Sequence, residues 1–319
     1  MLDGVDPGWG HPPPVSGRSL ANALTIDVED YFQVSALAPY IPRSEWERMP
    51  CRVERNMDTL LSLFAETGAQ ATFFTLGWIA ERYPGLVRRI VAEGHELASH
   101  GYAHQKITDQ APADFLADIR RAKAVLEDVS GNAIRGYRAP SFSIGEGNLW
   151  AFDCIGDAGY RYSSSVYPIR HDHYGMPGAP RFPFRPRDGL LEIPVSTARI
   201  LGTNIPAAGG GYFRLLPYCV SRSLLYKVNR GEERAAVFYI HPWELDPDQP
   251  RVAGTSVKTR FRHYLNLHRT RPRLKRLLRD FTWSSIENVF LNRKQEQTTF
   301  SRQSWPVDQN GGASRIIFP

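Results

Sequence analysis

The chain alternates between short apolar runs and longer segments in which apolar residues recur every three or four positions. The short runs predict buried strands at residues 23–28, 71–76, 96–99, 134–138, 160–162, 191–195 and 236–240. The longer segments predict helices with apolar stripes at Met57, Leu60, Leu61 and Phe64, at Ile79, Leu86, Val87 and Ile90, and at Phe115, Ile119, Ala122, Leu126 and Val129. A further helix is expected at 217–229.

Glycine and proline mark the ends of these helices. Gly68 and Gly94 follow the first two apolar stripes, and Pro112 precedes the third. Repeated strand–helix units predict a parallel sheet, but periodicity does not decide whether that sheet is open or closed into a barrel. The length of 319 residues fits one α/β barrel.

Composition divides the chain into a central domain and two tails. Residues 1–20 are rich in Pro and Gly, residues 295–319 are polar, and we expect both to be flexible tails around a domain at 21–294. The net charge of +6 is concentrated in an extension that begins at about residue 251, where ten Lys or Arg stand against one acidic residue up to Asp280. This extension fits a solvated helix face, or a surface for nucleic acid, anionic lipid or an acidic polysaccharide. We expect it to be dispensable for chemistry but to help engage polymer or an assembly partner.

The remaining totals indicate a soluble enzyme. The hydrophobic content is 42%, and three cysteines form no pair with zinc-ribbon spacing. We see neither a signal peptide nor an apolar run long enough to span a membrane. The sequence therefore predicts a cytoplasmic protein without a transmembrane segment, and peripheral association with a membrane stays open.

Polar residues of catalytic type follow the predicted strands. Asp27 and Glu29 end the first strand, His100 the third, Arg138 the fourth and His241 the last. In βα barrels the carboxyl ends of the strands meet at one mouth, where active sites lie. We therefore expect these five side chains to lie near one another.

A histidine pair indicates a metal site. His100 and His104, in SHGYAH, have the i, i+4 spacing that fits one helical turn and allows both to bind one ion. Two ordinary loop histidines are the alternative interpretation. The position at a strand end and the nearby acidic residues favour the metal.

The acidic motif TIDVED offers two carboxylates with different roles. Alternation along a strand places Asp27 and Glu29 on the same side. One of them can complete a His₂-carboxylate metal site, and the other can take a proton from water. Asp30 competes with Glu29 for the ligand position. An acidic start of a loop is the structural alternative.

Arg138 and His241 complete the set. A buried Arg138, in RGYRAPSF, can keep a carboxylate base ionised and oriented. His241, in YIHPWEL, can donate a proton to a leaving amine. Taken alone, each also fits a structural surface arginine or a core histidine.

In order, these motifs resemble the polysaccharide deacetylase family with the NodB homology domain, carbohydrate esterase family 4. The resemblance covers roughly residues 22 to 290 and rests on TIDVED, SHGYAH, RAPS and YIH. It implies a distorted (β/α)7-8 barrel and a hydrolase of non-peptide carbon–nitrogen bonds. DVEDYF, HPWELD and the basic extension look similar to a subgroup that accompanies exopolysaccharide gene clusters and the exosortase system, which implies exopolysaccharide biosynthesis and assembly partners.

The resemblance also implies a role for each residue. Many family members have two adjacent aspartates, a pattern that Val28 interrupts, whereas one branch has Asp-x-Asp, which Asp27-Val28-Glu29 resembles. The implied base is therefore Asp27, with Arg138 keeping it ionised and His241 as the acid. The implied ligands of a divalent metal, by default Zn²⁺, are Glu29 (or Asp30), His100 and His104. The backbone N–H near Ser141 is the implied oxyanion donor, and Trp243 the implied substrate contact.

Two other functions stay open at this point. The Asp-x-Asp branch includes hydrolases of small cyclic amides or ureides on the same barrel. Aromatic residues expected at the mouth favour a sugar, although they can equally be packing residues: Tyr31, Phe32, Tyr212 and Trp243. A non-catalytic carbohydrate- or nucleic-acid-binding module is the third possibility. The acid, metal and base set argues against it, so we expect an N-acetylated polysaccharide or oligosaccharide as the partner and no nucleic acid.

Overall fold

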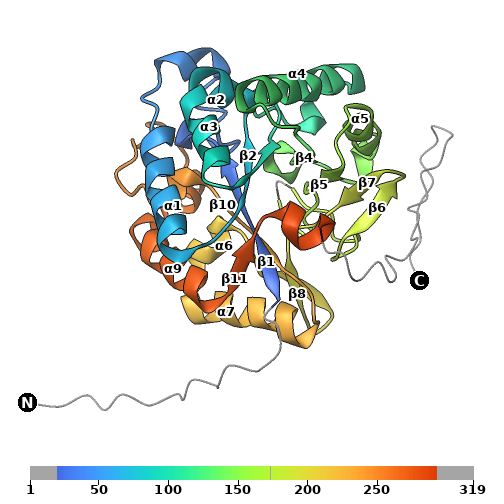
Figure 1. Ribbon diagram of the computed structural model, residues 1–319. Helices are drawn as coiled ribbons and strands as arrows, with labels where there is room; N and C mark the ends of the chain where they lie inside the picture. The colour runs from blue at the N-terminus through green and yellow to red at the C-terminus, as the bar shows by residue number, and fades with distance from the viewer. Residues whose placement is uncertain (1–19, 173, 293–319) are drawn as a thin grey trace, which may run out of the picture.

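The computed structural model (Figure 1) describes residues 20–172 and 174–292. The predicted tails at 1–20 and 295–319 lie outside the described residues, apart from Leu20, and stay predictions. Within the described ranges no helix is both long and apolar enough to cross a bilayer.

A nine-stranded sheet forms the centre of the molecule. Its parallel strands lie in the order β10 (Val237–Ile240), β1 (Ala21–Val28), β2 (Thr72–Thr75), β3 (Glu96–Ser99), β4 (Gly136–Tyr137), β5 (Tyr162–Ser163) and β7 (Leu190–Glu192). At the edges, β6 (Phe184–Arg187) is antiparallel to β7, and β11 (Thr282–Ser284) pairs with the start of β1. A separate hairpin consists of β8 (Thr197–Ile200) and β9 (Thr203–Pro206).

The sheet curls into a barrel whose last seam is incomplete. No ladder joins β7 to β10 in the described residues, but the chain beyond β7 lies against β10. The Ser196 N–H donates to the Val237 carbonyl (3.3 Å), and the Val237 N–H donates to Ser196 Oγ (2.7 Å). This irregular closure gives the distorted α/β barrel that the family resemblance implied.

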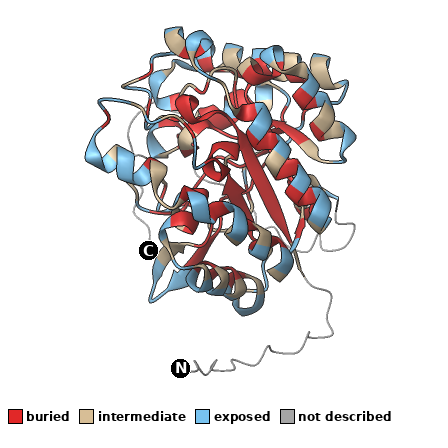
Figure 2. Ribbon diagram, turned by 90° about the vertical axis from the view of Figure 1, so that its left-hand side faces the viewer, coloured by how far each residue is buried: buried red, intermediate tan, exposed pale blue. Residues whose placement is uncertain are grey.

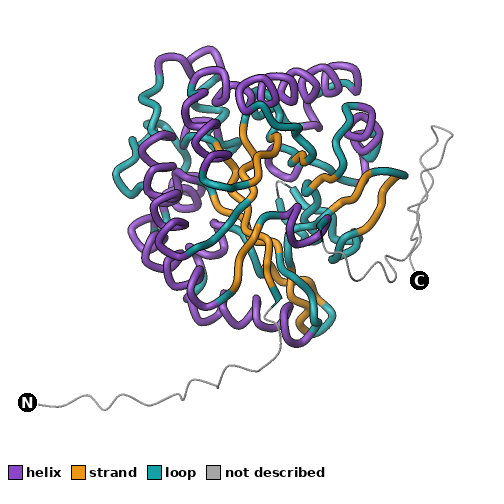
Figure 3. Tube along the Cα trace, viewed as in Figure 1, coloured by secondary structure: helices purple, strands orange, loops and turns teal. Residues whose placement is uncertain are grey.

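Helices cover the outside of the sheet (Figures 1 and 3). They are α1 (Val53–Thr67), α2 (Gly77–Arg82), α3 (Pro84–Ala92), α4 (Pro112–Ser130), α5 (Ala151–Asp157), α6 (Gly210–Leu215), α7 (Tyr218–Tyr226), α8 (Val257–Tyr264) and α9 (Leu267–Asp280). Short helical turns lie in the connections, at Tyr31–Gln33, Arg43–Arg48, Ile107–Asp109, Pro140–Phe142, Glu146–Asn148, Lys227–Gly231, Pro242–Leu245 and Glu287–Leu291.

Local chemistry explains where the structure departs from the sequence prediction. The helix expected across residues 79–94 is broken at Tyr83, because Pro84 lacks an N–H and disfavours helical conformation in the residue before it. The strands β4 and β5 are two residues long, shorter than their apolar runs suggested. The edge strand β6 and the hairpin strands β8 and β9 have no apolar run and were not predicted.

Successive side chains of β1 point alternately to the hydrophobic core and to the interior of the barrel. The side chains of Leu24, Ile26 and Val28 pack with the helices in the main core. Those of Thr25 and Asp27 point into the barrel, where both contact Arg138 at the end of β4. Figure 2 shows this strand and its neighbours as the buried centre of the molecule. The geometry of the strand therefore brings polar side chains into a buried interior.

Gly68 should be needed for the end of α1, where it is left-handed with φ of 68°. We expect Gly68→Ala to lower the free energy of unfolding by about 1 kcal/mol, because a Cβ is strained in this conformation. The matched control is Gly85→Ala in α3, where a Cβ meets nothing within 4 Å and φ is ordinary. Urea unfolding should show destabilisation only at position 68, and equal effects at both positions would contradict the assignment.

Candidate active site

The ends of four parallel strands bring the predicted polar residues together. Asp27 lies near the end of β1 and Glu29 directly after it, His100 follows β3, Arg138 follows β4 and His241 follows β10. The first four are at most 2% exposed. The side chain of His241 is 19% exposed, so it borders the opening of the site.

Two of these groups, Glu29 and His100, form a cluster suited to a metal ion together with His104. One ligand atom each from Glu29, His100 and His104 lies within 4.8 Å of the others. His100 Nδ1 is 2.8 Å from the Arg138 carbonyl, so this nitrogen carries the proton and Nε2 keeps its lone pair. Burial lowers the pKa of His100 to about 4, which keeps the ring neutral, as a metal ligand must be.

The donor atoms around Glu29 also fit a cation. Glu29 Oε2 is buried and lies 2.9 Å from His104 Nε2, and it has no other polar partner among the described residues. Burial would raise the pKa of Glu29, but the neighbouring histidines, above all His104, lower it to about 2. A buried carboxylate facing two imidazoles is satisfied by a divalent ion, and Glu29, His100 and His104 are the residues that would hold it.

The histidine pair reaches this geometry without a helix. His100 ends β3, and His104 follows in a loop with the unusual φ of 52°. Gly101 is also left-handed, with φ of 76°. These two turns bring the ring centroids to 5.2 Å, so the expected helical turn is corrected to a tight loop.

Asp30 does not join the cluster. Its carboxylate accepts hydrogen bonds from the backbone N–H groups of Tyr31 (2.8 Å) and Val53 (2.8 Å), and from Arg52 N–H and Cys51 Sγ–H. Asp30 therefore joins the end of β1 to the first residues of α1. Of the two competing carboxylates, Glu29 has the place beside the histidines.

Arg138 holds Asp27 inside the barrel. Its Nη1 donates to Asp27 Oδ1 (2.6 Å) and to Thr25 Oγ1 (2.8 Å). The other donors reach the Ser164 carbonyl (3.0 Å) and Ser164 Oγ (2.9 Å). The guanidinium thus has several fixed acceptors, and Asp27 is oriented by a charge-assisted bond. Thr25 and Ser164 were not singled out from the sequence, although both adjoin predicted strands.

His241 lies between the two acidic groups of β1. Its Nε2 is 3.4 Å from Glu29 Oε1 and 3.9 Å from Asp27 Oδ2, and its Nδ1 is 2.7 Å from Glu244 Oε1. Burial would lower the pKa of His241, but the hydrogen bond with Glu244 and the surrounding carboxylates raise it to about 9. His241 is therefore protonated at neutral pH.

Sequence reasoning missed Glu244, although it stands three residues after His241 in HPWE. It also missed Arg214, whose Nε donates to Glu244 Oε2 at 2.6 Å. The glycine run before Arg214 is the one sequence feature that could have indicated a close contact there.

The two predicted substrate residues lie in different settings. Ser141 and the following Phe142 are left-handed, with φ of 54° and 50°, and Ser141 Oγ is 2.6 Å from Ser35 Oγ. Trp243 is 5% exposed, stacks on His263 at 4.4 Å, and its Nε1 lies 3.4 Å from Glu29 Oε1. This places Trp243 behind the metal carboxylate and not on a surface open to a sugar.

Other aromatic residues expected at the mouth are packing residues. Tyr31 and Phe32 are buried in a cluster with Trp46, whereas Tyr212 is only partly buried.

We expect His100→Ala and His104→Ala to abolish tight metal binding, because each removes one of three donors. Glu29→Ala should also lower the bound metal. Zinc content of the purified, folded variants is measured by atomic absorption. Full occupancy in either histidine variant would contradict the site.

Asp30→Ala should behave in the opposite way. It should keep metal binding and lose roughly 1–3 kcal/mol of stability, because it leaves buried backbone N–H groups unpaired. Urea unfolding and zinc content on one sample test this. Loss of metal with unchanged stability would move the ligand role to Asp30.

Two family models match adjacent parts of the chain. Residues 46–162 match the polysaccharide deacetylase family model, and residues 164–291 match a domain of unknown function, DUF3473. The Bacillus cereus peptidoglycan-N-acetylglucosamine deacetylase is 32% identical over 93 residues, which cover 29% of this chain and 34% of that protein. The Azorhizobium caulinodans chitooligosaccharide deacetylase is 33% identical over 79 residues, covering 24% and 38%.

The match thus spans little more than a third of these curated relatives. Among solved structures, one from Mycobacterium smegmatis, provisionally described as a polysaccharide deacetylase, has the same fold. It has a TM-score of 0.54 and 20% identity, over 86% of this chain and 91% of that one. Residues 46–162 therefore carry a polysaccharide deacetylase domain, as the resemblance to the NodB homology domain implied.

Proposed function

We propose that this chain is a metal-dependent hydrolase that removes N-acetyl groups from amino sugars of a bacterial polysaccharide. One observation carries the proposal. A carboxylate that a buried arginine orients lies on one side of the Glu29–His100–His104 cluster, and a cationic histidine lies beside the same cluster. Asp27 is the candidate base, His241 the candidate acid, and Glu29 belongs to the cluster between them. Amide hydrolysis needs such a pair, because water must lose a proton and the amine must gain one.

Glu29, His100 and His104 would hold the ion. Zn²⁺ is the usual occupant of a catalytic site with two histidines and one carboxylate. When bound, such an ion would act as a Lewis acid that polarises the acetyl carbonyl and makes water a better nucleophile at neutral pH. The two proton transfers are carried out by side chains of the protein.

Asp27 accepts the proton of the attacking water. Its Oδ1 is bonded to Arg138, which leaves Oδ2 directed to the side of His241, 3.9 Å away. The charge-assisted bond from Arg138 holds this carboxylate in one orientation. The backbone N–H of Ser141, in the left-handed turn after Pro140, is the proposed donor to the developing oxyanion.

His241 donates the second proton. Because Nδ1 is bonded to Glu244, the acidic N–H available to a substrate is at Nε2, on the side of Asp27 and Glu29. A pKa near 9 keeps that proton in place at neutral pH until the amine departs. Cleavage of the C–N bond then gives acetate and a free amino sugar.

The names of the relatives support the substrate class. They are deacetylases of peptidoglycan N-acetylglucosamine and of chitooligosaccharides, so N-acetylglucosamine units are the proposed target. An exopolysaccharide, with assembly partners, is proposed from DVEDYF and HPWELD. Arg52 bridges these two motifs, because its backbone N–H donates to Asp30 and its Nη2 donates to Asp246 Oδ1 at 3.0 Å. A cytoplasmic or membrane-peripheral location stays part of this proposal.

The defining experiment is acetate release from N-acetylglucosamine oligomers of defined length, with the metal content measured on the same sample. We expect acetate to be released in proportion to bound metal. Ring opening of a cyclic ureide without any acetate release would instead identify a small cyclic amide hydrolase.

Asp27→Asn should separate metal binding from proton transfer. Asparagine keeps the size of aspartate but cannot accept the proton, so we expect kcat to fall by roughly 10²–10⁴-fold with bound metal retained. His241→Ala should also be severely impaired in kcat, because the amine leaves poorly without a proton. Steady-state acetate release and zinc analysis check both variants. A near-normal kcat in metal-loaded Asp27→Asn would show that the base is assigned wrongly.

A further inference from the structure

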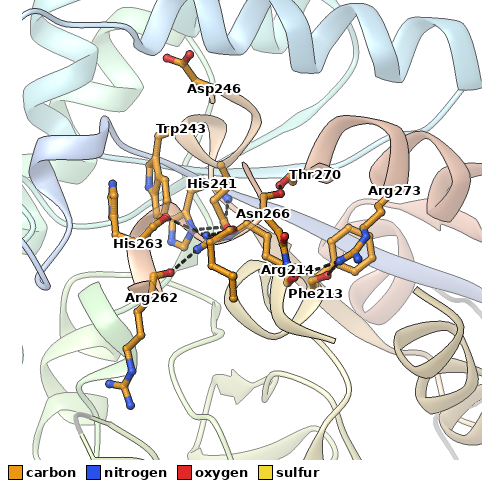
Figure 4. A network of polar contacts seen from close by, with 12 residues as sticks. Phe213, Arg214, His241, Trp243, Asp246, Arg262, His263, Asn266, Thr270 and Arg273 are labelled. Atoms are coloured by element: carbon orange, nitrogen blue, oxygen red, sulfur yellow. Dashed lines mark hydrogen bonds and ion pairs between the residues drawn. The ribbon is translucent and has the colours of Figure 1, made fainter. Parts of the chain in front are cut away.

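The proposed acid is held by a second, fully buried ion pair. Glu244 Oε1 accepts from the backbone N–H of His241 (3.1 Å) and lies 2.7 Å from its Nδ1. Glu244 Oε2 accepts from Arg214 Nε at 2.6 Å. Glu244 is 0% and Arg214 3% exposed, so the three groups form a chain closed to solvent except at His241. Figure 4 shows Arg214 at the centre of this network.

The remaining donors of Arg214 bind the backbone at the end of α8. Nη1 donates to the carbonyls of His263 (2.9 Å) and Leu265 (2.8 Å), and Nη2 to the carbonyl of Arg262 (3.2 Å). The last carbonyls of a helix lack partners within the helix, and a buried guanidinium needs several acceptors. Arg214 satisfies both needs, so the end of α8 and the carboxylate of Glu244 fix its position together.

The glycine run before Arg214 makes room for this arrangement. A Cβ at Gly210 would overlap the Glu244 carboxylate, and one at Gly209 would crowd Tyr239. Gly209 also has φ of 102°, a conformation that other residues rarely adopt. The segment AGGGYFR is therefore shaped around the carboxylate at position 244.

The same part of α8 reaches the metal side of the site. The ring of His263 stacks on Trp243 at 4.4 Å, and its Nε2 is 2.7 Å from Gln249 Oε1. Trp243 Nε1 in turn lies 3.4 Å from Glu29 Oε1. Residues 262–265 thus support the acid through Arg214 and the metal carboxylate through Trp243.

We infer that Arg214 is a positioning residue that fixes Glu244, and through it His241, against the end of α8. Residues 262–265 of the basic extension then support the catalytic groups and are not dispensable. Residues 164–291, the region of unknown function, supply and hold the proton donor of the barrel. The catalytic part of this inference rests on the proposed deacetylase function, whereas the positioning part does not.

Three variants test the role of Arg214. Arg214→Met removes the charge and all its hydrogen bonds, Arg214→Lys can keep the bond to Glu244, and Glu244→Gln keeps the shape of the side chain without its charge. The matched control is Arg273→Met on α9. Arg273 Nη1 binds only carbonyls at the end of α6, those of Phe213, Arg214 and Leu216, at 2.9–3.2 Å.

We expect Arg214→Met and Glu244→Gln to lower kcat for acetate release by roughly ten- to a hundredfold, with KM and bound zinc unchanged. Arg214→Lys should recover part of this loss. Arg273→Met should stay within about twofold of the wild type in kcat, whatever its effect on stability. A normal kcat in folded, metal-loaded Arg214→Met, or an equal loss in Arg273→Met, would overturn the inference. If Arg214→Met does not fold, Glu244→Gln carries the same comparison.

A second measurement needs no substrate. In ¹H NMR of the zinc-loaded protein, the hydrogen-bonded Nδ1–H of His241 should give a downfield signal, assigned by its loss in His241→Ala. This signal should disappear in Glu244→Gln and shift or broaden in Arg214→Met, and it should be unchanged in Arg273→Met. An unchanged signal in Arg214→Met would overturn the positioning role. Absence of any acetate release by the wild type would refute the proposed function. The NMR signal would still decide whether Arg214 positions Glu244 and His241.

Discussion

The ion pair between Arg138 and Asp27 is the interaction on which the site depends. Transferring a guanidinium and a carboxylate into a protein interior costs several kcal/mol for each ion, and only mutual pairing and further hydrogen bonds offset this cost. Here Arg138 has four fixed acceptor contacts, with Asp27, Thr25 and two atoms of Ser164, and its charged group lies over the ring of Phe74. The pair therefore draws β1, β4 and the end of β5 together around one ionised base.

A second buried ion pair, between Arg214 and Glu244, orients the proposed acid in the same way. Arg214 and Glu244 are as fully enclosed as Arg138 and Asp27, and they hold a histidine where the first pair holds a base. The two arginines come from the two halves of the chain that match different family models. Neither matched region contains a complete acid–base set, since Asp27 lies before residue 46, His100 and His104 lie in the first region, and His241 lies in the second. The barrel is thus the smallest unit that can perform the proposed chemistry.

Features fixed by the local geometry of the chain could be predicted from the sequence. The two-residue period of a strand placed Asp27 and Glu29 on one side, and parallel strands ending at one mouth brought His100 and His241 to them. The pairing of Arg138 with Asp27 was implied by the family resemblance, which makes Asp27 the base and Arg138 the residue that orients it.

Features fixed by contacts between distant segments could not be predicted. The cap that Asp30 forms depends on the backbone of Arg52 and Val53, and only the folded chain brings that backbone to Asp30. The approach of His104 depends on a left-handed turn, which the i, i+4 spacing does not reveal. Arg214 and Glu244 are 30 residues apart and both lie outside the strands, so no periodicity connects them.

The central claim is that one ion at Glu29, His100 and His104 works with Asp27 and His241 to hydrolyse an acetamide. Its most direct test is a zinc titration of the chelator-stripped protein, with the rate of acetate release from an N-acetylglucosamine oligomer followed at each addition. The account predicts that the stripped protein is inactive and that the rate rises in proportion to zinc, with a break at one equivalent. Acetate release that is independent of added or removed metal would contradict it.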